Sequence, residues 1–208
     1  MHHLQHQWEK LLEMFGIEQA KAGTTFTAIV HMYSSPGRVY HTLEHIQAML
    51  TWIDRLRDNA LDLPTLQLAC WFHDSVYDSS ARDNEEQSAT YAQRVLSDFA
   101  LPPTTIAAVS QMILSTKTHQ TEESNTDCHI LLDADLAILG APALDYDSYA
   151  QAIRQEYSWV AEAAYKTGRR QVLQAFLQRK RIYWTELIYA ALEGQARENI
   201  HREIALLS

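Results

Sequence analysis

The sequence predicts a single all-α domain, and three observations support that fold class. Apolar residues recur at three- and four-residue spacing along almost the whole chain, which is the period of an amphipathic helix. No segment alternates apolar and polar residues in the way that a half-buried strand does. The chain has 208 residues, of which 47% are hydrophobic, so it holds enough apolar material for one sizeable core.

In the first half of the chain, the apolar spacing and the residues that interrupt it define six expected helices. They lie around residues 4–15, 26–33, 43–53, 66–77, 84–99 and 106–113. Ser35-Pro36-Gly37 separates the second helix from the third, and Pro64 suits the first turn of the fourth. Asn84, with Gln87 three residues later, resembles a capping box that starts the fifth helix.

The second half continues with helices but contains the one long loop that we expect, the polar stretch Thr116–Asp127. A further apolar helix follows at about 130–139 and ends near Gly140, and two or three amphipathic helices occupy about 145–206. No repeat or linker divides the chain. We therefore expect one domain over residues 1–208, with a helical bundle over about 25–140 and additional C-terminal helices.

Composition narrows the class of protein. The 26 acidic residues outnumber the 17 basic ones, for a formal charge of −9, which is the wrong sign for a protein that binds extended nucleic acid. Two cysteines against ten histidines favour a reducing compartment over a disulfide scaffold. No export signal and no membrane-spanning apolar run is recognisable, so we expect a cytoplasmic protein without membrane contact. The oligomeric state stays open, and a homodimer is one option.

Three helices carry polar residues where apolar ones are expected. His73-Asp74 follows the apolar run Leu68–Phe72, and burying an ionised Asp costs several kcal/mol unless it is paired or bound to a metal. Taken alone, this segment is equally well explained by a structural His-Asp pair. Asp133 and Asp135 interrupt the apolar run at 130–139, and Asp135 has apolar residues at its three- and four-residue offsets.

The third anomaly is a pair of histidines, His41 and His45, one turn apart on an expected helix whose apolar stripe includes Leu43, Ile46 and Leu50. A single divalent cation accounts for all three anomalies. Its predicted ligands are two imidazoles and two carboxylates, from His45, His73, Asp74 and Asp135. This ligand set suits Mn, Fe, Co, Ni or Zn, with Mg as a less natural choice.

These residues resemble the HD superfamily of metal-dependent phosphohydrolases, whose pattern is a His, then a His-Asp pair, then a distant Asp, all on helices. The resemblance extends over about residues 38–197 and is closest to a bacterial subgroup of small predicted HD phosphohydrolases. It is carried by the strings RVYHTLEHI, WFHDSVYD, DNEEQSA, TKTH, LLDADLAILG and IRQEY. It implies an enzyme that hydrolyses a phosphoester or phosphoanhydride of a small substrate with a metal-activated water, and a nucleotide-like molecule is one option for that substrate.

Further residues suit such a reaction. Because Asp74 and Asp135 cancel the charge of a divalent cation, an anionic phosphate needs other cations, and we expect Lys117, His119 and, farther away, Arg154 to bind it. Glu85 or Asp133 is the candidate base that orients or deprotonates water. Asp74 and Lys117 complete the predicted catalytic set. Glu85 also suits the first turn of a helix, and Asp133 also suits a partner of a ligand histidine.

Two other functions stay open. Some HD proteins are oxygenases that bind two irons through extra histidines between the His-Asp pair and the last Asp, an interval that contains His119 and His129. A helical module that binds a metal or nucleotide without catalysis is the other. HD nucleotidases carry a Glu three residues after the motif's Asp, where this chain has Tyr77, so the resemblance does not favour that activity.

Overall fold

The computed structural model describes residues 1–207, and in this part of the chain every regular element is helical, as predicted. The chain order is α1 (His2–Met14), α2 (Gln19–Tyr33), α3 (Leu43–Arg55), the 3₁₀ helix η1 (Arg57–Asn59), α4 (Leu63–Phe72), α5 (Asn84–Asp98), α6 (Pro103–Thr116), α7 (Thr126–Leu136), the 3₁₀ helix η2 (Ala137–Gly140), α8 (Ala143–Glu156), α9 (Glu162–Gln178) and α10 (Glu186–Leu206). The expected long loop and three C-terminal helices are confirmed.

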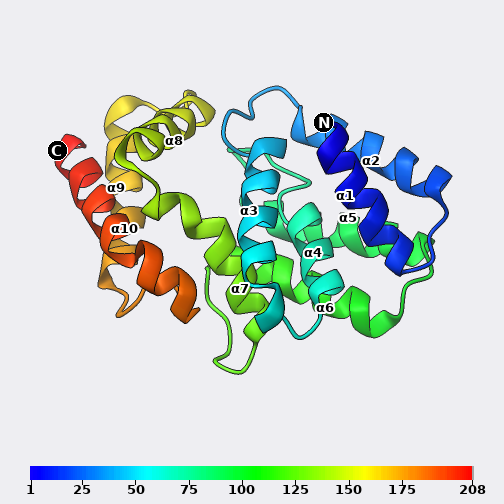
Figure 1. Ribbon diagram of the computed structural model, residues 1–208. Coiled ribbons are helices and arrows are strands. Elements are labelled where there is room, and N and C mark those ends of the chain that lie inside the picture. The colour runs from blue at the N-terminus through cyan, green and yellow to red at the C-terminus, as the bar shows by residue number, and fades with distance from the viewer. Residues whose placement is uncertain (208) are drawn as a thin grey trace.

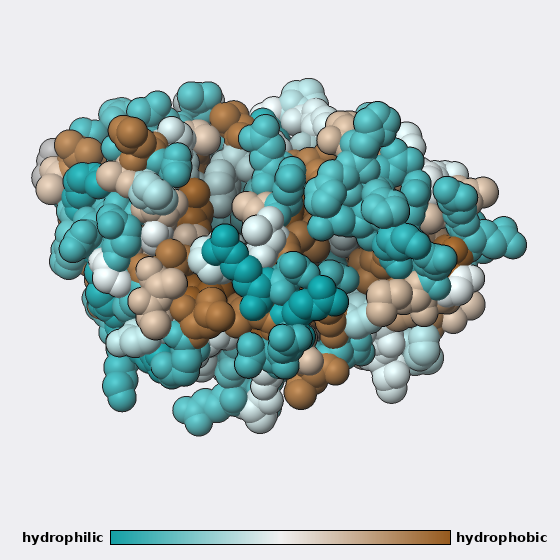
Figure 2. Space-filling model, in the orientation of Figure 1, coloured by the Kyte–Doolittle hydropathy of each residue, from teal (hydrophilic) through white to brown (hydrophobic). Residues whose placement is uncertain are grey.

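Three helices that pack against one another, α3, α4 and α7, occupy the middle of the molecule (Figure 1). The N-terminal helices α1 and α2 lie at one end, and α8, α9 and α10 lie at the other with the C-terminus. Polar side chains cover most of the face seen in Figure 2, and the apolar surface shows through in separate patches. Within residues 1–207 no helix combines the length and the apolar character that crossing a bilayer requires.

The buried side chains form one connected core that runs from Leu4 in α1 to Ile200 in α10. Trp8 of α1 packs edge-on against two rings of α4, Trp71 and Phe72, at centroid distances of 5.3 and 5.8 Å. Its indole N–H donates to the carbonyl of Ala22, so burial leaves no orphan donor. Helix α1, although outside the range expected for the bundle, therefore holds α4 in place.

Two local expectations are wrong. Helix α4 ends at Phe72 and does not continue to Tyr77, and the turn that follows closes with the Ser75 N–H donating to the Phe72 carbonyl at 3.0 Å. Asn84 is inside α5 and does not cap it. Its side-chain oxygen accepts from the Asp78 N–H, and its amide donates to the Asp78 carbonyl, both at 2.9 Å. Both hydrogen-bonding groups of the Asn84 side chain are thus used to close the loop between α4 and α5, so neither caps the helix.

The C-terminal helices are joined to the bundle by a close backbone contact between η2 and α10. A Cβ on Gly140 would lie 2.5 Å from Leu192 Cβ and 2.8 Å from the Leu192 carbonyl oxygen. Asn199 of α10 also donates to the carbonyls of Leu139 and Ala141, at 2.9 and 2.8 Å. This contact holds α10 against η2, which follows directly on α7.

Candidate metal centre

The three central helices bring His45, His73 and Asp135 to one place. Helix α3 starts at Leu43 because the Thr42 side chain caps it by accepting from the Glu44 N–H, which puts His45 in its first turn. His73 is the residue directly after α4, and Asp135 is the last but one residue of α7. Each side chain therefore sits at or near a helix end, and the three ends meet.

The ligand atoms of these three residues all lie within 4.8 Å of one another. Asp135 Oδ1 is 3.1 Å from His45 Nε2 and 3.8 Å from His73 Nε2. His45 and His73 are buried, at 4% and 1% exposure, which is unusual for ionisable side chains. Three of the four predicted ligands thus form a compact, buried group that could hold one metal ion.

The ring nitrogens support this assignment. The Nε2 atoms of His45 and His73 are both buried and make no well-aligned hydrogen bond; their nearest polar neighbours are carboxylate oxygens of Asp135 and Asp74, at 3.1 and 3.2 Å. His73 Nδ1 lies 2.9 Å from the Cys70 carbonyl, which can only accept, so Nδ1 carries the proton and donates it. A backbone carbonyl that fixes the tautomer in this way is typical of ligand histidines. The two imidazoles and the carboxylate fit a first-row divalent cation.

The fourth predicted ligand, Asp74, lies beside the group, with Oδ2 3.2 Å from His73 Nε2. Burial disfavours a charged imidazole, yet the charges of Asp74 and Asp135 raise the pKa of His73 to about 9. Burial would raise the pKa of Asp135, but the neighbouring His119 and His45 hold it well below its ordinary value. The pocket therefore attracts positive charge strongly, as a cation site must.

Arg38, from the segment before α3, holds the chain that carries Asp74. Its guanidinium donates to the Asp74 carbonyl at 2.7 Å, to the Ser75 carbonyl at 3.1 Å and to the His41 carbonyl at 2.9 Å. These bonds satisfy carbonyls that follow the end of α4, and they join the two histidine-bearing segments. Arg38 opens the string RVYHTLEHI, but its clamping role is not evident from the sequence.

The group borders a cavity of about 820 Å³ that runs between the bundle and the C-terminal helices α8 and α9. Four of the residues predicted for catalysis or substrate binding also line it, together with Asp135. They are Asp74, Glu85, Lys117 and His119. Its volume falls within the range of about 300–1,000 Å³ that is usual for pockets for small organic molecules.

His119 lies closest to the group, with Nε2 2.9 Å from Asp135 Oδ2. Its backbone has a φ of 49°, in the left-handed region that residues other than glycine rarely adopt. Arg179 supports this turn by donating to the carbonyls of His119 and Thr118, at 3.0 and 2.9 Å. Strained backbone held by its surroundings is common at functional sites, and here it presents the imidazole to Asp135.

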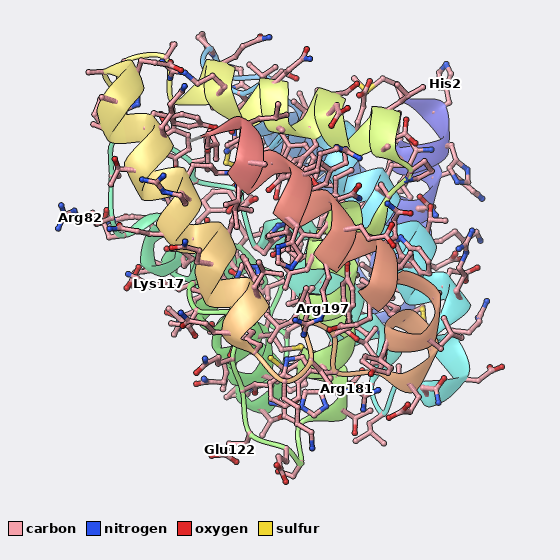
Figure 3. The ribbon with its side chains drawn as sticks, turned by 90° about the vertical axis from the view of Figure 1, so that its left-hand side faces the viewer. His2, Arg82, Lys117, Glu122, Arg181 and Arg197 are labelled. Atoms are coloured by element: carbon pink, nitrogen blue, oxygen red, sulfur yellow. The ribbon has the colours of Figure 1, made fainter. Side chains whose placement is uncertain are left out.

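Lys117 lies at the mouth of the cavity. Its ammonium group pairs with the Glu86 carboxylate and donates to the Arg82 carbonyl at 2.8 Å. Lys117 and Arg82 lie at the same edge of the molecule, beside α9 (Figure 3). Glu85, the other candidate at this edge, is in the first turn of α5. A phosphate that binds Lys117 therefore has to replace a carboxylate partner.

Asp133 does not face the cavity, although it is two residues from Asp135. Its side chain is buried, and it accepts from the N–H groups of Trp184 and Thr185 and from the Thr185 hydroxyl, all at 2.7 Å. Burial raises its pKa to about 6 against the effect of these donors. Asp133 anchors the start of α10, so it is neither the base nor a partner of a ligand histidine.

Arg154 is also placed away from the cavity wall. Its guanidinium donates to the carbonyls of Tyr157 and Val160, at 2.7 and 3.2 Å, and pairs with Glu162 at 3.1 Å. It closes the turn between α8 and α9. His129, which the two-iron alternative needs, stacks on Trp184 at 4.4 Å and does not join the group. Of the two histidines between the His73-Asp74 pair and Asp135, only His119 therefore lies next to the candidate ligands.

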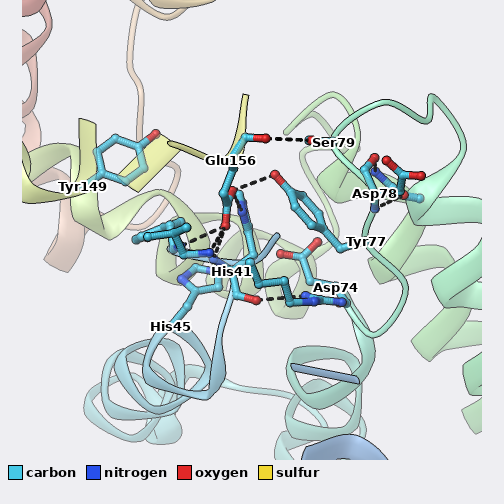
Figure 4. A network of polar contacts seen from close by, with 12 residues as sticks. His41, His45, Asp74, Tyr77, Asp78, Ser79, Tyr149 and Glu156 are labelled. Carbon is cyan, nitrogen blue, oxygen red and sulfur yellow. Dashed lines mark hydrogen bonds and ion pairs between the residues drawn. The ribbon is translucent and has the colours of Figure 1, made fainter. Parts of the chain in front are cut away.

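A network that the sequence analysis did not predict links the cavity to α8. Glu156 has no exposed side-chain surface, and its Oε1 accepts from the N–H groups of Val39, Tyr40 and His41, at 2.7, 2.8 and 3.1 Å. Its Oε2 is 2.6 Å from His41 Nδ1 and accepts from the Tyr77 hydroxyl at 2.7 Å (Figure 4). One buried carboxylate thus satisfies five donors.

This network orients His41 in the cavity wall. Burial opposes protonation of His41, but the hydrogen bond and charge of Glu156 raise the pKa of the imidazole above its ordinary value. The ring stacks on Tyr77 with a centroid distance of 4.4 Å. The string IRQEY contains Glu156, yet 115 residues separate it from His41, so only the folded chain reveals the pair.

Fold and site together define an all-helical protein with a candidate metal centre of two histidines and one aspartate, bordering a cavity. No family model, curated protein or solved structure matches the chain.

Proposed function

We propose that the protein is a metal-dependent phosphohydrolase of the HD type, which cleaves a phosphoester or phosphoanhydride bond of a small substrate. One observation carries the proposal: His45, His73 and Asp135 converge in a buried group whose Nε2 atoms face only carboxylates, and Asp135 opens this group to the cavity. The HD pattern in the sequence predicts the same residues. His45, His73 and Asp135 would hold the cation, with Asp74 as the fourth ligand.

A divalent cation in this position supplies two effects, a lower pKa for water and polarisation of the phosphoryl group. The remaining tasks fall to the chain. Lys117 and His119 line the cavity on the same side as Asp135, so they are the groups that can bind the other phosphate oxygens. Glu85 lines the cavity near Lys117 and is the candidate that orients the attacking water.

His41 is suited to protonate the leaving oxygen. Glu156 fixes Nδ1, so the opposite ring nitrogen is the one that a substrate can meet. The pair has the arrangement of a general acid held by an orienting carboxylate. Glu156 touches His41 and not the substrate, which makes it a positioning residue.

The experiment has a binding arm and an activity arm. The purified protein is stripped with a chelator, reloaded with Mn²⁺, Co²⁺, Ni²⁺, Zn²⁺ or Fe²⁺, and its metal content is measured per chain. Phosphomonoesters, cyclic dinucleotides and nucleoside triphosphates are then tested for phosphate release. We expect about one ion per chain and at least one hydrolysed class, with both lost in His73→Ala and Asp135→Ala.

His129→Ala is the matched control, because His129 lies on the same helix as Asp135 but stacks on Trp184 outside the cavity. It should keep both the metal and the activity. Hydrolysis that is unchanged by His73→Ala and Asp135→Ala would contradict the proposal. So would two irons per chain with oxygen-dependent turnover, which would favour the oxygenase.

A further inference from the structure

The cavity has two unlike walls. The wall formed by the bundle carries the charged and polar groups described above, including Asp74, His119 and Asp135. The opposite wall, from α8, α9 and the turn between them, carries Arg169, Gln171 and Arg179 beside a mainly apolar and aromatic surface. We call this surface the α9 face and define it by Val160, Ala164, Tyr165, Gly168, Val172 and Phe176.

Four of these residues, at positions 164, 168, 172 and 176, are four apart, so they form one stripe along α9. None of the four has a side chain that donates or accepts a hydrogen bond. Val172 is 50% exposed, because the stripe borders the open cavity and not the core. An apolar surface left uncovered in this way favours an apolar ligand.

Gly168 leaves the middle of this face without a side chain. A glycine inside a helix costs about 1 kcal/mol relative to alanine, so it usually has a packing reason. Here a Cβ would have no atom within 4 Å, in contrast to Gly140, where it would collide with Leu192. Neighbouring protein atoms therefore do not require the glycine, and a larger side chain there would extend into the cavity.

The arginines of this wall are already engaged. Arg169 pairs with Glu203, at 2.8 and 3.1 Å, and Arg179 donates to the carbonyls of Thr118 and His119. Their charges are thus used within the protein. Lys117 is paired as well, but the side chains of Lys117 and Glu86 are 40% and 46% exposed, against 10% and 9% for Arg169 and Glu203, so its partner is exchanged more easily. A phosphate is therefore better served at the other wall, by the cation site and Lys117, which leaves the α9 face for an uncharged part of the ligand.

We infer that the α9 face binds the organic part of the substrate, and that this part carries an aromatic ring. The inference rests on the proposed function for the position of the phosphate. Phe176, which is only partly buried, supplies aromatic surface, and the space beside Gly168, where a Cβ would have no neighbour within 4 Å, suits a flat ring. A compact polar phosphate, such as glycerol phosphate or pyrophosphate, would leave most of the 820 Å³ unfilled.

The test compares two phosphonates, whose carbon–phosphorus bond resists hydrolysis, by calorimetry on the Mn²⁺-loaded protein. Naphthylphosphonate should bind about ten- to a hundredfold more tightly than methylphosphonate, because it buries an aromatic body as well. Gly168→Leu should remove this preference and leave the affinity for methylphosphonate unchanged. Val172→Ser, at a half-exposed position that tolerates substitution, should reduce the preference in the same direction.

Gly194→Leu is the matched control, because Gly194 also lies inside a helix with no atom near its Cβ but is outside the cavity. Equal affinity of the wild-type protein for the two phosphonates would overturn the inference, as would an equal loss for both in Gly168→Leu. A naphthyl preference without hydrolysis of naphthyl phosphate would support the α9 face and contradict the phosphohydrolase. Hydrolysis of methyl and naphthyl phosphate with the same KM would support the phosphohydrolase and contradict the α9 face as a binding surface.

Discussion

Glu156 and His41 form a pair, with 2.6 Å between Oε2 and Nδ1, although 115 residues separate them in the chain. The same carboxylate also binds the backbone N–H groups of residues 39, 40 and 41. It thereby joins the end of α8 to the segment that precedes α3, the helix that carries the candidate ligand His45. The C-terminal helices are thus part of the site.

The first prediction concerns proton donation by His41. His41→Ala and Glu156→Gln should lower kcat for an alkyl phosphate about a hundredfold, because an alkoxide needs a proton to leave. p-Nitrophenyl phosphate, whose leaving group needs no proton, should be affected much less, and the metal content should not change. Glu162→Gln, an exposed acid of α9, is the control. An equal loss for both substrates would assign the pair a structural role only.

The second prediction concerns stability at low pH. Burial would raise the pKa of Glu156, but His41 and the backbone donors lower it from 4.5 to about 2. A carboxylate whose pKa is depressed by folding stabilises the protein above its unfolded value, here by about 3 kcal/mol, and loses this as the pH falls from about 4.5 towards 2.

Urea denaturation of the wild-type protein and of Glu156→Gln at a series of pH values measures this contribution to stability. The difference in free energy of unfolding should be largest at pH values above 4.5 and should shrink steadily below that value. A difference that stays constant across this window would show that Glu156 contributes through packing rather than through its charge.

The third prediction separates two acids of α7 that are two residues apart. Asp133→Asn should keep the metal but lower the free energy of unfolding by about 1–3 kcal/mol, because its amide group would face the N–H donors of Trp184 and Thr185. Asp135→Asn should lose the metal. Denaturation and metal analysis of both variants decide the case, and metal loss in Asp133→Asn would contradict the placement of that side chain.

The fourth prediction concerns the contact between η2 and α10. Gly140→Ala should destabilise the protein by about 1–3 kcal/mol, because the new Cβ would collide with Leu192. Gly194→Ala, at an open position of α10, should instead be neutral or stabilise by up to about 1 kcal/mol. Thermal denaturation compares the two. A Gly140→Ala protein as stable as the wild type would mean that α10 can move away.

Much of the fold could be predicted from the sequence because helical periodicity is a local property. The spacing of Leu4, Trp8 and Leu11 predicts α1, and the polar residues after Thr116 predict the loop before α7. The end of α4 could not be predicted, because Arg38 binds the carbonyls that follow Phe72 from a distant segment. The role of Asn84 likewise depends on Asp78, which faces it across a loop.

The all-α class and the candidate ligands can be predicted from the chain alone, because helical periodicity and a His or Asp in an apolar helical run are local features. Which of these residues meet depends on how the helices pack. Asp133 and Asp135 look alike in the chain, but one anchors α10 and the other joins His45 and His73. The choice depends on the packing of helices from three distant segments, and a local pattern does not encode it. For the same reason, the Glu156–His41 pair and the α9 face become visible only in the folded molecule.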